Sequence, residues 1–197
     1  MGISAGKKAQ NYTYSDYLNW PDEERWELID GVPYNMSPAP STEHQRISRD
    51  IEMQFVNYLR GKNCEVFYAP FDVRLPQGNE NDEDITTVVQ PDIVIICDKN
   101  KLDKRGCKGA PDLVVEIISH ATAKKDMQEK FFLYERSGVK EYWLVFPLEH
   151  AIDVYMLDEN NKYERNGLYQ YPDDGKVKVG IFDDLEIDLS LVFGEQA

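Results

Sequence analysis

Residues 111–119, PDLVVEIIS, give the clearest indication of fold class in this 197-residue chain. Its centre, residues 113–118, is rich in valine and isoleucine, which is typical of a strand covered on both faces. Residues 93–97 and 141–146 are strand-like runs of similar length. Because helix-like sequence separates two of these strands, we expect an α/β fold with a central mixed β-sheet flanked by α-helices.

Two long helices are expected beside this sheet. Residues 41–60 carry apolar side chains at helical spacing behind Ser41, a residue type that caps helix N-termini. A second helix is expected over residues 122–136. Residues 26–36, WELIDGVPYNM, predict a β-hairpin around their Asp-Gly pair. The remaining predicted elements are a short helix at residues 14–20 and strands at residues 65–68, 71–75, 151–157 and 163–165.

Length and composition predict one domain. With 42% hydrophobic residues, a chain of this length can bury a substantial core. We expect an N-terminal extension at residues 1–12, a single domain over residues 13–193 and a tail at residues 194–197. No apolar run is long enough to span a membrane, and the first residues contain no apolar leader. A cytoplasmic protein without a membrane segment is therefore expected.

The cysteines and the missing motifs argue against several classes of protein. The three cysteines have no C-x-x-C spacing, which predicts neither a disulfide framework nor a zinc knuckle. They are Cys64, Cys97 and Cys107. The three histidines are too scattered in the sequence to suggest a zinc site. Glycine-rich phosphate loops, the G-x-S-x-G elbow and the H-E-x-x-H motif are all absent from the sequence.

The net charge of −14 argues against a protein that coats nucleic acid nonspecifically. The charge is unevenly distributed, however, because residues 99–140 hold ten Lys and Arg against six Asp and Glu. A solvated loop at residues 99–108 accounts for half of these basic residues without any function.

Two acids mark a candidate site. Glu116 interrupts the apolar run, and a carboxylate inside a buried strand is costly unless it is paired or bound to metal. Glu116 could equally lie at the open end of its strand beside a lysine. Asp92 heads the preceding strand, where an acid after proline is also ordinary turn chemistry.

A third acid, Asp112, is excluded as the partner of Glu116 in a metal site. Four residues along a strand separate the two side chains by about 13 Å, whereas oxygens on one magnesium ion lie within about 4 Å of each other. Asp92, on an adjacent strand, is close enough to share an ion with Glu116.

The expected second helix adds a basic group. Asp126, Lys130 and Tyr134 recur every four residues and so form one stripe. The stripe borders an apolar arc that includes Met127 and Phe131, which places Lys130 at the rim of the buried face. The spacing alone also fits an Asp–Lys pair on a solvated surface, of little consequence for stability.

Several motifs follow one another in a distinctive order: ELIDG at 27–31, His44, QPD at 90–92, DLVVEIIS at 112–119, Asp126, Lys130, Tyr134, and EYWLV at 141–145. In this order and spacing the chain resembles the prokaryotic “putative restriction endonuclease” family, a domain-of-unknown-function group of the PD-(D/E)XK nuclease superfamily. Each motif is weak by itself, and the resemblance rests on their combination over residues 13–193.

The resemblance implies a restriction-endonuclease-like α/β core that binds Mg²⁺ or Mn²⁺ and cleaves DNA. By the superfamily's pattern, Asp92 and Glu116 are metal ligands, and the backbone carbonyl of Ile117 is a third. The lysine usual two residues after the second acid is replaced by Ile118. The family supplies the amine from the next helix instead, and Lys130 is the matching position.

Lys124 and Lys125 are rivals for the role of Lys130, ranked lower because they lie at the start of the helix. Asp126 and Tyr134 would hold Lys130 in place. A lysine in such a site stays protonated near pH 7, because its usual pKa is about 10.4. It would therefore donate to the attacking water or to the scissile phosphate.

Glu27 and His44 match positions near the same cleft in the family. Glu27 could take part in catalysis by binding a second metal or holding a water, although a place at a hairpin edge explains it equally well. A place near a helix cap explains His44 equally well. The implied partner is DNA, bound weakly and salt-sensitively by a homodimer.

Two other functions stay open. A nuclease fold that has lost catalysis would act as a nucleic-acid- or protein-binding module, because a fold does not determine function. A sugar hydrolase using a carboxylate pair would need a second acid of raised pKa beside Glu116, and nothing in the sequence marks one.

Overall fold

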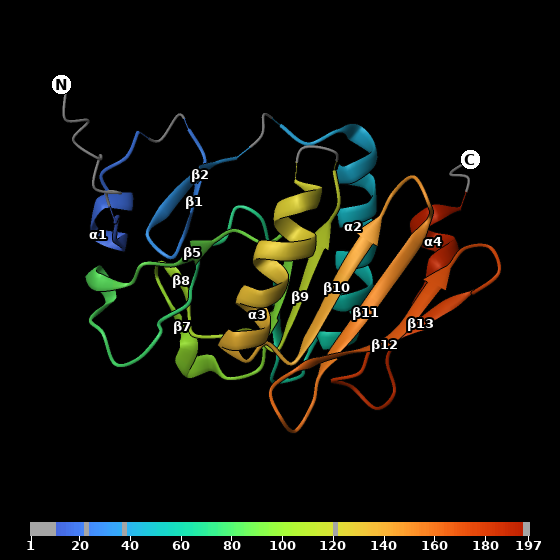
Figure 1. Cartoon of the computed structure of the whole chain (residues 1–197). Coiled ribbons are helices and arrows are strands. Elements are labelled where there is room, and N and C mark those ends of the chain that lie inside the picture. Colours follow the sequence, from blue (N-terminus) through green and yellow to red (C-terminus); the bar gives the residue numbers. More distant parts are fainter. Residues whose placement is uncertain (1–10, 22–23, 37–38, 120–121, 195–197) are drawn as a thin grey trace.

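The structure is a computed structural model that describes residues 11–21, 24–36, 39–119 and 122–194. The expected N-terminal extension and C-terminal tail lie almost wholly outside these residues. Two larger β-sheets lie side by side, one built mainly from the N-terminal half of the chain and one holding the longer strands (Figure 1). None of the helices in the described ranges is long and apolar enough to cross a membrane.

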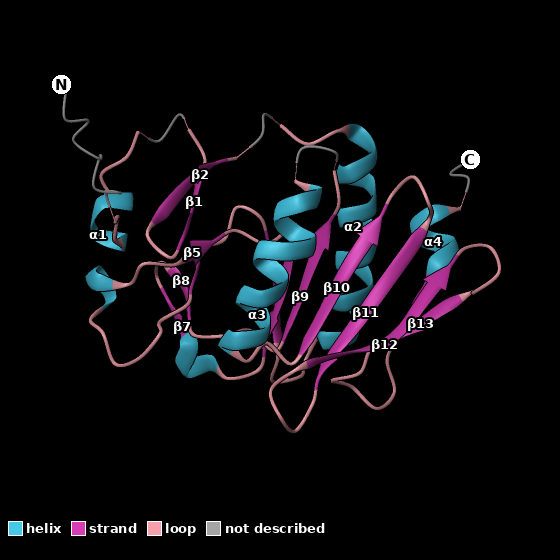
Figure 2. Cartoon of the chain, viewed as in Figure 1, coloured by secondary structure: helices cyan, strands magenta, loops and turns pink. Residues whose placement is uncertain are grey.

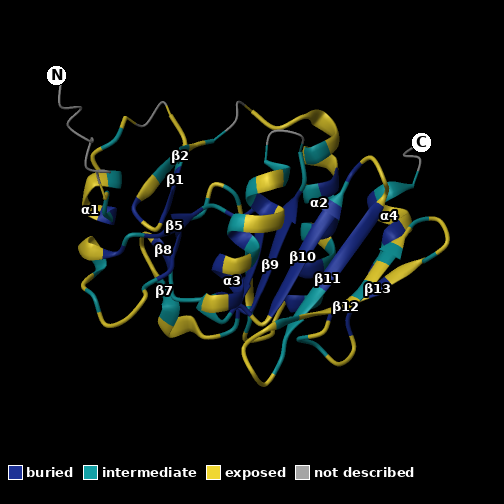
Figure 3. Cartoon of the chain, viewed as in Figure 1, coloured by how far each residue is buried: buried dark blue, intermediate teal, exposed yellow. Residues whose placement is uncertain are grey.

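The main sheet has six strands in the order β12-β11-β10-β9-β6-β3. β9 and β10 are parallel, whereas the other neighbours are antiparallel, so the predicted central mixed sheet is confirmed. The central strands are buried (Figure 3), as their apolar sequences require. The six strands are β3 (Glu65–Tyr68), β6 (Ile93–Ile96), β9 (Leu113–Ile117), β10 (Glu141–Phe146), β11 (Ala151–Leu157) and β12 (Tyr163–Gln170).

Two helices cover opposite faces of the main sheet (Figure 2). Val115 of β9 packs in the same cluster as Ile51 of α2, whereas its neighbour Val114 packs with Leu133 of α3. Because side chains alternate along a strand, Glu116 points to the same face as Val114, toward α3. The helices are α1 (Tyr14–Tyr17), α2 (Thr42–Leu59), α3 (Phe131–Ser137) and α4 (Leu189–Phe193).

The predicted helix at residues 41–60 is confirmed as α2. The Ser41 hydroxyl accepts a hydrogen bond from the backbone N–H of His44 at 3.1 Å and so caps the helix. This cap fixes the first turn of α2 at the end of the main sheet where β9 finishes. It thereby sets the position of His44.

A second sheet of six short strands was not expected from the sequence. The predicted hairpin forms part of it, with Asp30 at φ 50° and Gly31 at φ 75°, left-handed values that suit a tight hairpin turn. The other strands have only two or three residues, too few to show an alternating pattern. In sheet order the strands are β2 (Val32–Asn35), β1 (Trp26–Ile29), β5 (Val88–Val89), β4 (Val73–Arg74), β8 (Gly106–Lys108) and β7 (Leu102–Asp103). The remaining elements are the pair β13 (Lys176–Lys178) and β14 (Glu186–Asp188) and the 3₁₀ turns η1 (Asp82–Asp84) and η2 (Lys99–Lys101).

The second predicted helix contains a π-helical turn. This segment, η3 (Lys125–Lys130), runs directly into α3. A π turn bonds residues five apart rather than four, so it changes which side chains share a face. Met127, expected on the buried arc, is 47% exposed, and that expectation is wrong. Phe131 is partly buried against the core as expected, and Lys130, expected at the rim, is buried.

Cys64 and Cys97 form a disulfide, which corrects the expectation drawn from cysteine spacing. β3 and β6 pair antiparallel with Glu65 opposite Ile96, so the next residues outward are the two cysteines. This contact depends on the register of the strands, which the interval between two cysteines in a sequence does not reveal. Cys107 is a buried free thiol.

Candidate active site

A pocket of about 650 Å³ lies at one end of the main sheet. The carboxyl ends of β9 and β10 meet the start of β6 there, because β9 and β10 are parallel and β6 runs in the opposite direction. The start of α2 and the segment η3 complete the wall. The predicted site residues that line the pocket are Asp92, Glu116, Ile117, His44, Asp126 and Lys130.

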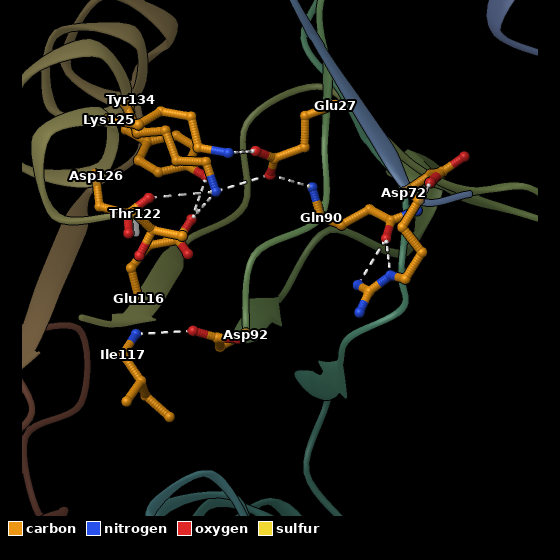
Figure 4. A network of polar contacts seen from close by, with 12 residues as sticks. Glu27, Asp72, Gln90, Asp92, Glu116, Ile117, Thr122, Lys125, Asp126 and Tyr134 are labelled. Atoms are coloured by element: carbon orange, nitrogen blue, oxygen red, sulfur yellow. Dashed lines mark hydrogen bonds and ion pairs between the residues drawn. The ribbon is translucent and has the colours of Figure 1, made fainter. Parts of the chain in front are cut away.

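Asp92 and Glu116 are neighbours on adjacent strands. Ile93 pairs with Val115, so the antiparallel register continues to Asp92 opposite Glu116. The Oδ2 atom of Asp92 accepts a hydrogen bond from the backbone N–H of Ile117 at 2.8 Å (Figure 4). The two acids predicted to act together therefore meet at the same end of the sheet.

Glu116 lines the pocket yet is only 4% exposed. Its Oε1 atom accepts hydrogen bonds from the Lys130 ammonium at 2.8 Å and from the Tyr134 hydroxyl at 2.7 Å. Burial raises the pKa of Glu116 well above its usual value. Lys130 opposes this shift, and neighbouring carboxylates, Asp126 foremost, add to it.

Lys130 is a buried ammonium surrounded by three carboxylates. Its Nζ atom lies 2.7 Å from Glu27 Oε1, 2.8 Å from Glu116 Oε1 and 3.7 Å from Asp126 Oδ1. Burial lowers the pKa of Lys130, but the three carboxylates outweigh it and the net shift is well above the usual value. Lys130 is therefore a cation at neutral pH, and its pair with Asp126 is buried rather than solvated.

Glu27 holds two lysines at once. Lys125 Nζ lies 2.6 Å from its Oε2 atom, while Lys130 Nζ and the backbone N–H of Gln90 bind its Oε1 atom. Five residues along an α-helix leave two side chains about 140° apart. The wider π turn of η3 reduces this angle, which allows both lysines to reach one carboxylate. The rival Lys124 is exposed.

The charge on Glu27 is stabilised by this arrangement. Burial raises the pKa of Glu27, but Lys130 and Lys125 outweigh that effect, and the net shift is downward. Glu27 is fully buried, and both of its oxygens are ion-paired. It lies behind the pocket wall and supports the lysines.

His44 extends from the first turn of α2 to Asp92, with its Nε2 atom 3.3 Å from Asp92 Oδ2. Burial lowers the pKa of His44, but the hydrogen bond and the charge of Asp92 raise it more, so the net shift is upward. The Nδ1 atom of His44 is buried and has no hydrogen-bond partner within the described ranges.

Asp126 is a buried acid with one oxygen that lacks a hydrogen bond. Its Oδ1 atom makes no hydrogen bond to any residue that the structure describes, although Lys130 is nearby. Burial raises the pKa of Asp126, and Lys130 opposes that shift. Asp126 lines the pocket, so this oxygen is a candidate acceptor for a water or an ion.

The donors around the pocket suit a hard divalent cation. Asp92 and Glu116 offer carboxylate oxygens, and Ile117 adds a backbone carbonyl. Magnesium prefers one or two carboxylates and several waters. A dication would also relieve the repulsion that helps to raise the pKa of Glu116. Across the described ranges no three His, Cys, Asp or Glu side chains converge as a ready-made metal cluster, so water or substrate would have to complete the shell.

Sequence reasoning missed Arg25, which lines the pocket. The Arg25 guanidinium donates to the side-chain oxygen of Gln90 at 2.8 Å, which links the QPD motif to the pocket wall. The only available signal was a basic residue next to the predicted hairpin. Asp112, excluded as a ligand, accepts a hydrogen bond from Lys140 at 2.7 Å instead.

Comparison with known proteins identifies the family of the chain and a similar fold. The family model Uma2, described as “Putative restriction endonuclease”, matches residues 14–190. The uncharacterized protein slr1290 of Synechocystis sp. is 28% identical over 151 residues, which are 75% of each chain. The crystal structure of a “putative nuclease belonging to DUF820” from Anabaena variabilis matches with a TM-score of 0.70 and 19% identity, over 92% of this chain and 97% of that one. The chain therefore belongs to the Uma2 “putative restriction endonuclease” family, and its fold is that of its nuclease-like structural neighbour.

Proposed function

We propose that this chain is an endonuclease that uses Mg²⁺ or Mn²⁺ to hydrolyse the phosphodiester bonds of DNA. The observation that carries the proposal is the meeting of Asp92, Glu116 and Lys130 in one pocket. Phosphodiester hydrolysis depends on charge stabilisation and positioning more than on covalent chemistry. Two acids beside a protonated amine supply both, and membership of the Uma2 family supports the same class of reaction.

Asp92 and Glu116, with the carbonyl of Ile117, would hold the ion. When bound, such an ion polarises a phosphate oxygen and lowers the pKa of a coordinated water. The protein holds both acids in place before an ion binds. His44 and the Ile117 N–H hold Asp92. Lys130 and Tyr134 hold Glu116. Groups that orient ligands in this way are usual around catalytic metals.

Lys130 would stabilise the phosphate undergoing attack. Because it is a cation at neutral pH, it donates protons in hydrogen bonds and does not remove one from water. Asp126 would help to hold the amine, whereas Tyr134 would hold Glu116, to which its hydroxyl donates a hydrogen bond. Glu27 would act as a positioning residue rather than as a metal ligand, because lysines already occupy both of its oxygens.

Contact with DNA would be limited and sensitive to salt, because a chain of net charge −14 repels phosphate over much of its surface. We propose that a homodimer brings a second set of basic residues to the same DNA. Light scattering with and without a DNA oligonucleotide tests this, and a monomer under both conditions would argue against it.

Plasmid cleavage tests the proposed activity. Wild-type protein should cut with Mn²⁺ or Mg²⁺ and stop on addition of EDTA, whereas Glu116→Gln and Asp92→Asn should be inactive and folded. A matched control is Glu186→Gln, which alters an exposed carboxylate on β14 that is ion-paired with Lys176. Cleavage by the Glu116→Gln variant, or cleavage by the wild type in the presence of EDTA, would refute the proposal.

A second candidate is a catalytically inactive DNA- or protein-binding module. One observation favours it: the Oε1 atom of Glu116 already accepts two hydrogen bonds, so half of this acid is committed to the internal network. Thermal unfolding with millimolar Mn²⁺ separates the two candidates. A rise in Tm that Asp92→Asn abolishes supports the metal site, whereas no rise and no cleavage support the binding module.

A further inference from the structure

Apolar side chains line the pocket together with the acids and the lysine already described. Six of them follow β9 in the chain: one directly after β9, two in or just before η3, and three at the end of β10 or in the turn beyond it. We call these six residues the apolar wall: Ile118, Ala123, Met127, Phe146, Pro147 and Leu148. Phosphodiester chemistry does not require apolar side chains, so their presence in the pocket needs a separate explanation.

Two large apolar side chains of this wall are strongly exposed. Met127 on η3 is 47% exposed, and Leu148, beyond β10, is 70% exposed. They come from different elements and line the same pocket. Exposed apolar groups at the wall of a pocket commonly mark a binding surface, and methionine adapts well to flat ligands.

The pocket is larger than a hydrated ion needs. Six waters around a cation occupy about 180 Å³ at about 30 Å³ each. The pocket volume of about 650 Å³ falls instead in the range of sites that hold organic ligands. Space therefore remains beside the acids for a group as large as a nucleobase.

The charges around the pocket do not suit a duplex. Among the residues that the structure describes, the Lys and Arg side chains of the pocket are Arg25, Lys125 and Lys130, and each is hydrogen-bonded or ion-paired within the protein. Five carboxylates of the described residues line the same pocket: Glu43, Asp92, Glu116, Asp126 and Glu149. Duplex DNA is held mainly by free Lys and Arg along its phosphates. An unpaired strand can also bind through the faces of its bases, which apolar and aromatic side chains accept.

We infer that the substrate enters the pocket as an unpaired DNA strand, with one base against Met127 and Leu148 and its phosphate toward Asp92 and Glu116. This inference rests on the proposed function and names its substrate class. A duplex would be cut only where it opens: at a flap, gap or frayed end, or where negative supercoiling separates the strands of a plasmid. Met127 and Leu148 would be specificity residues that do not touch the reacting atoms.

Binding without cleavage tests the inference separately from activity. The probes are a short single-stranded DNA containing 2-aminopurine, the same strand in a duplex, and an RNA strand of the same sequence, each in Ca²⁺. We expect the single-stranded DNA to bind at least about tenfold more tightly than the duplex. We also expect 2-aminopurine fluorescence to change when its base meets the apolar wall.

Variants test the wall itself. Met127→Ala and Leu148→Ala should each weaken binding of the single strand about fivefold and reduce the change in fluorescence. Leu191→Ala, at a residue that is 57% exposed on α4 and does not line the pocket, should do neither. Circular dichroism checks that all three variants are folded.

The outcomes distinguish the inference from the proposed function. Equal or tighter binding of the duplex, tighter binding of RNA, or no effect of both wall variants overturns the inference, even if plasmid is cut. Tight binding of single-stranded DNA that the variants weaken, with no cleavage of any DNA, supports the entry of an unpaired strand and overturns the nuclease proposal.

Discussion

Replacing Lys130 by methionine should destabilise the protein strongly. The variant keeps an apolar side chain of similar length and removes the charged ammonium group. In the wild type this group contacts Glu27, Glu116 and Asp126, all of them buried. Lys125 still neutralises Glu27 in the variant, so Glu116 and Asp126 are the carboxylates left without a counter-ion.

The expected loss of stability follows from the burial of the ammonium group, because only 2% of the Lys130 side chain is exposed. Removing one partner of a buried ion pair costs about 3–5 kcal/mol. In a domain of this size each kcal/mol lowers Tm by about 2–4 °C, which gives an expected fall of about 6–20 °C. The loss should shrink as the pH falls, because Glu116, whose pKa is already raised, then takes up a proton and no longer needs a counter-ion.

Urea and thermal unfolding of both proteins at pH 7 and pH 5 measure this effect. The matched control is Lys140→Met, because Lys140 also contacts a buried acid, Asp112, at 2.7 Å, but its own side chain is 65% exposed. Such a pair should contribute less than about 1 kcal/mol. A loss in Lys130→Met no larger than that of the control, or one that grows as the pH falls, would refute the assignment of a buried cation at this position.

Three further outcomes are expected. Lys125→Met should destabilise the protein less than Lys130→Met in urea unfolding, because Lys125 is partly exposed and Glu27 keeps Lys130; an equal loss would contradict this ranking. Ser41→Ala should lower the unfolding free energy by about 1 kcal/mol through loss of the α2 cap, and Ser41→Thr should restore most of it. Burial raises the pKa of the Cys107 thiol to about 11, so at pH 8 only about one thiol in a thousand is ionised. Ellman's reagent should therefore detect about one thiol only after unfolding without reductant, and rapid reaction of folded protein would count against the buried thiol.

The parts of the fold that the sequence made predictable are those with long, regular patterns. The run at residues 113–118 and the apolar face behind Ser41 correspond to β9 and α2. The second sheet was not predicted, because most of its strands have two or three residues and pair with strands distant in sequence. The disulfide was not predicted for a related reason. The register of β3 on β6 brings Cys64 to Cys97, and the sequence alone does not show this register.

Part of the candidate site could be predicted from the sequence for a different reason. Glu116 could be identified as a candidate because a carboxylate is unusual in a buried aliphatic strand. In the structure, buried polar side chains donate hydrogen bonds to it. The spacing of residues 126, 130 and 134 identified Lys130 as a candidate, but it did not show that Lys130 is buried. A sequence read with α-helical spacing separates Lys125 from Lys130, so the contact of both with Glu27 emerges only from the π turn.

Glu27 comes from β1 in the second sheet, whereas Lys130 and Glu116 belong to the layers around the main sheet. A fragment that kept the main sheet but lacked β1 would remove the ion-pair partner of Lys125 and one of the three carboxylates around Lys130. The two halves of the chain therefore cannot be divided into a self-sufficient core and a dispensable attachment. A minimal version of this molecule has to retain its N-terminal hairpin, although that hairpin contributes only a supporting carboxylate to the centre.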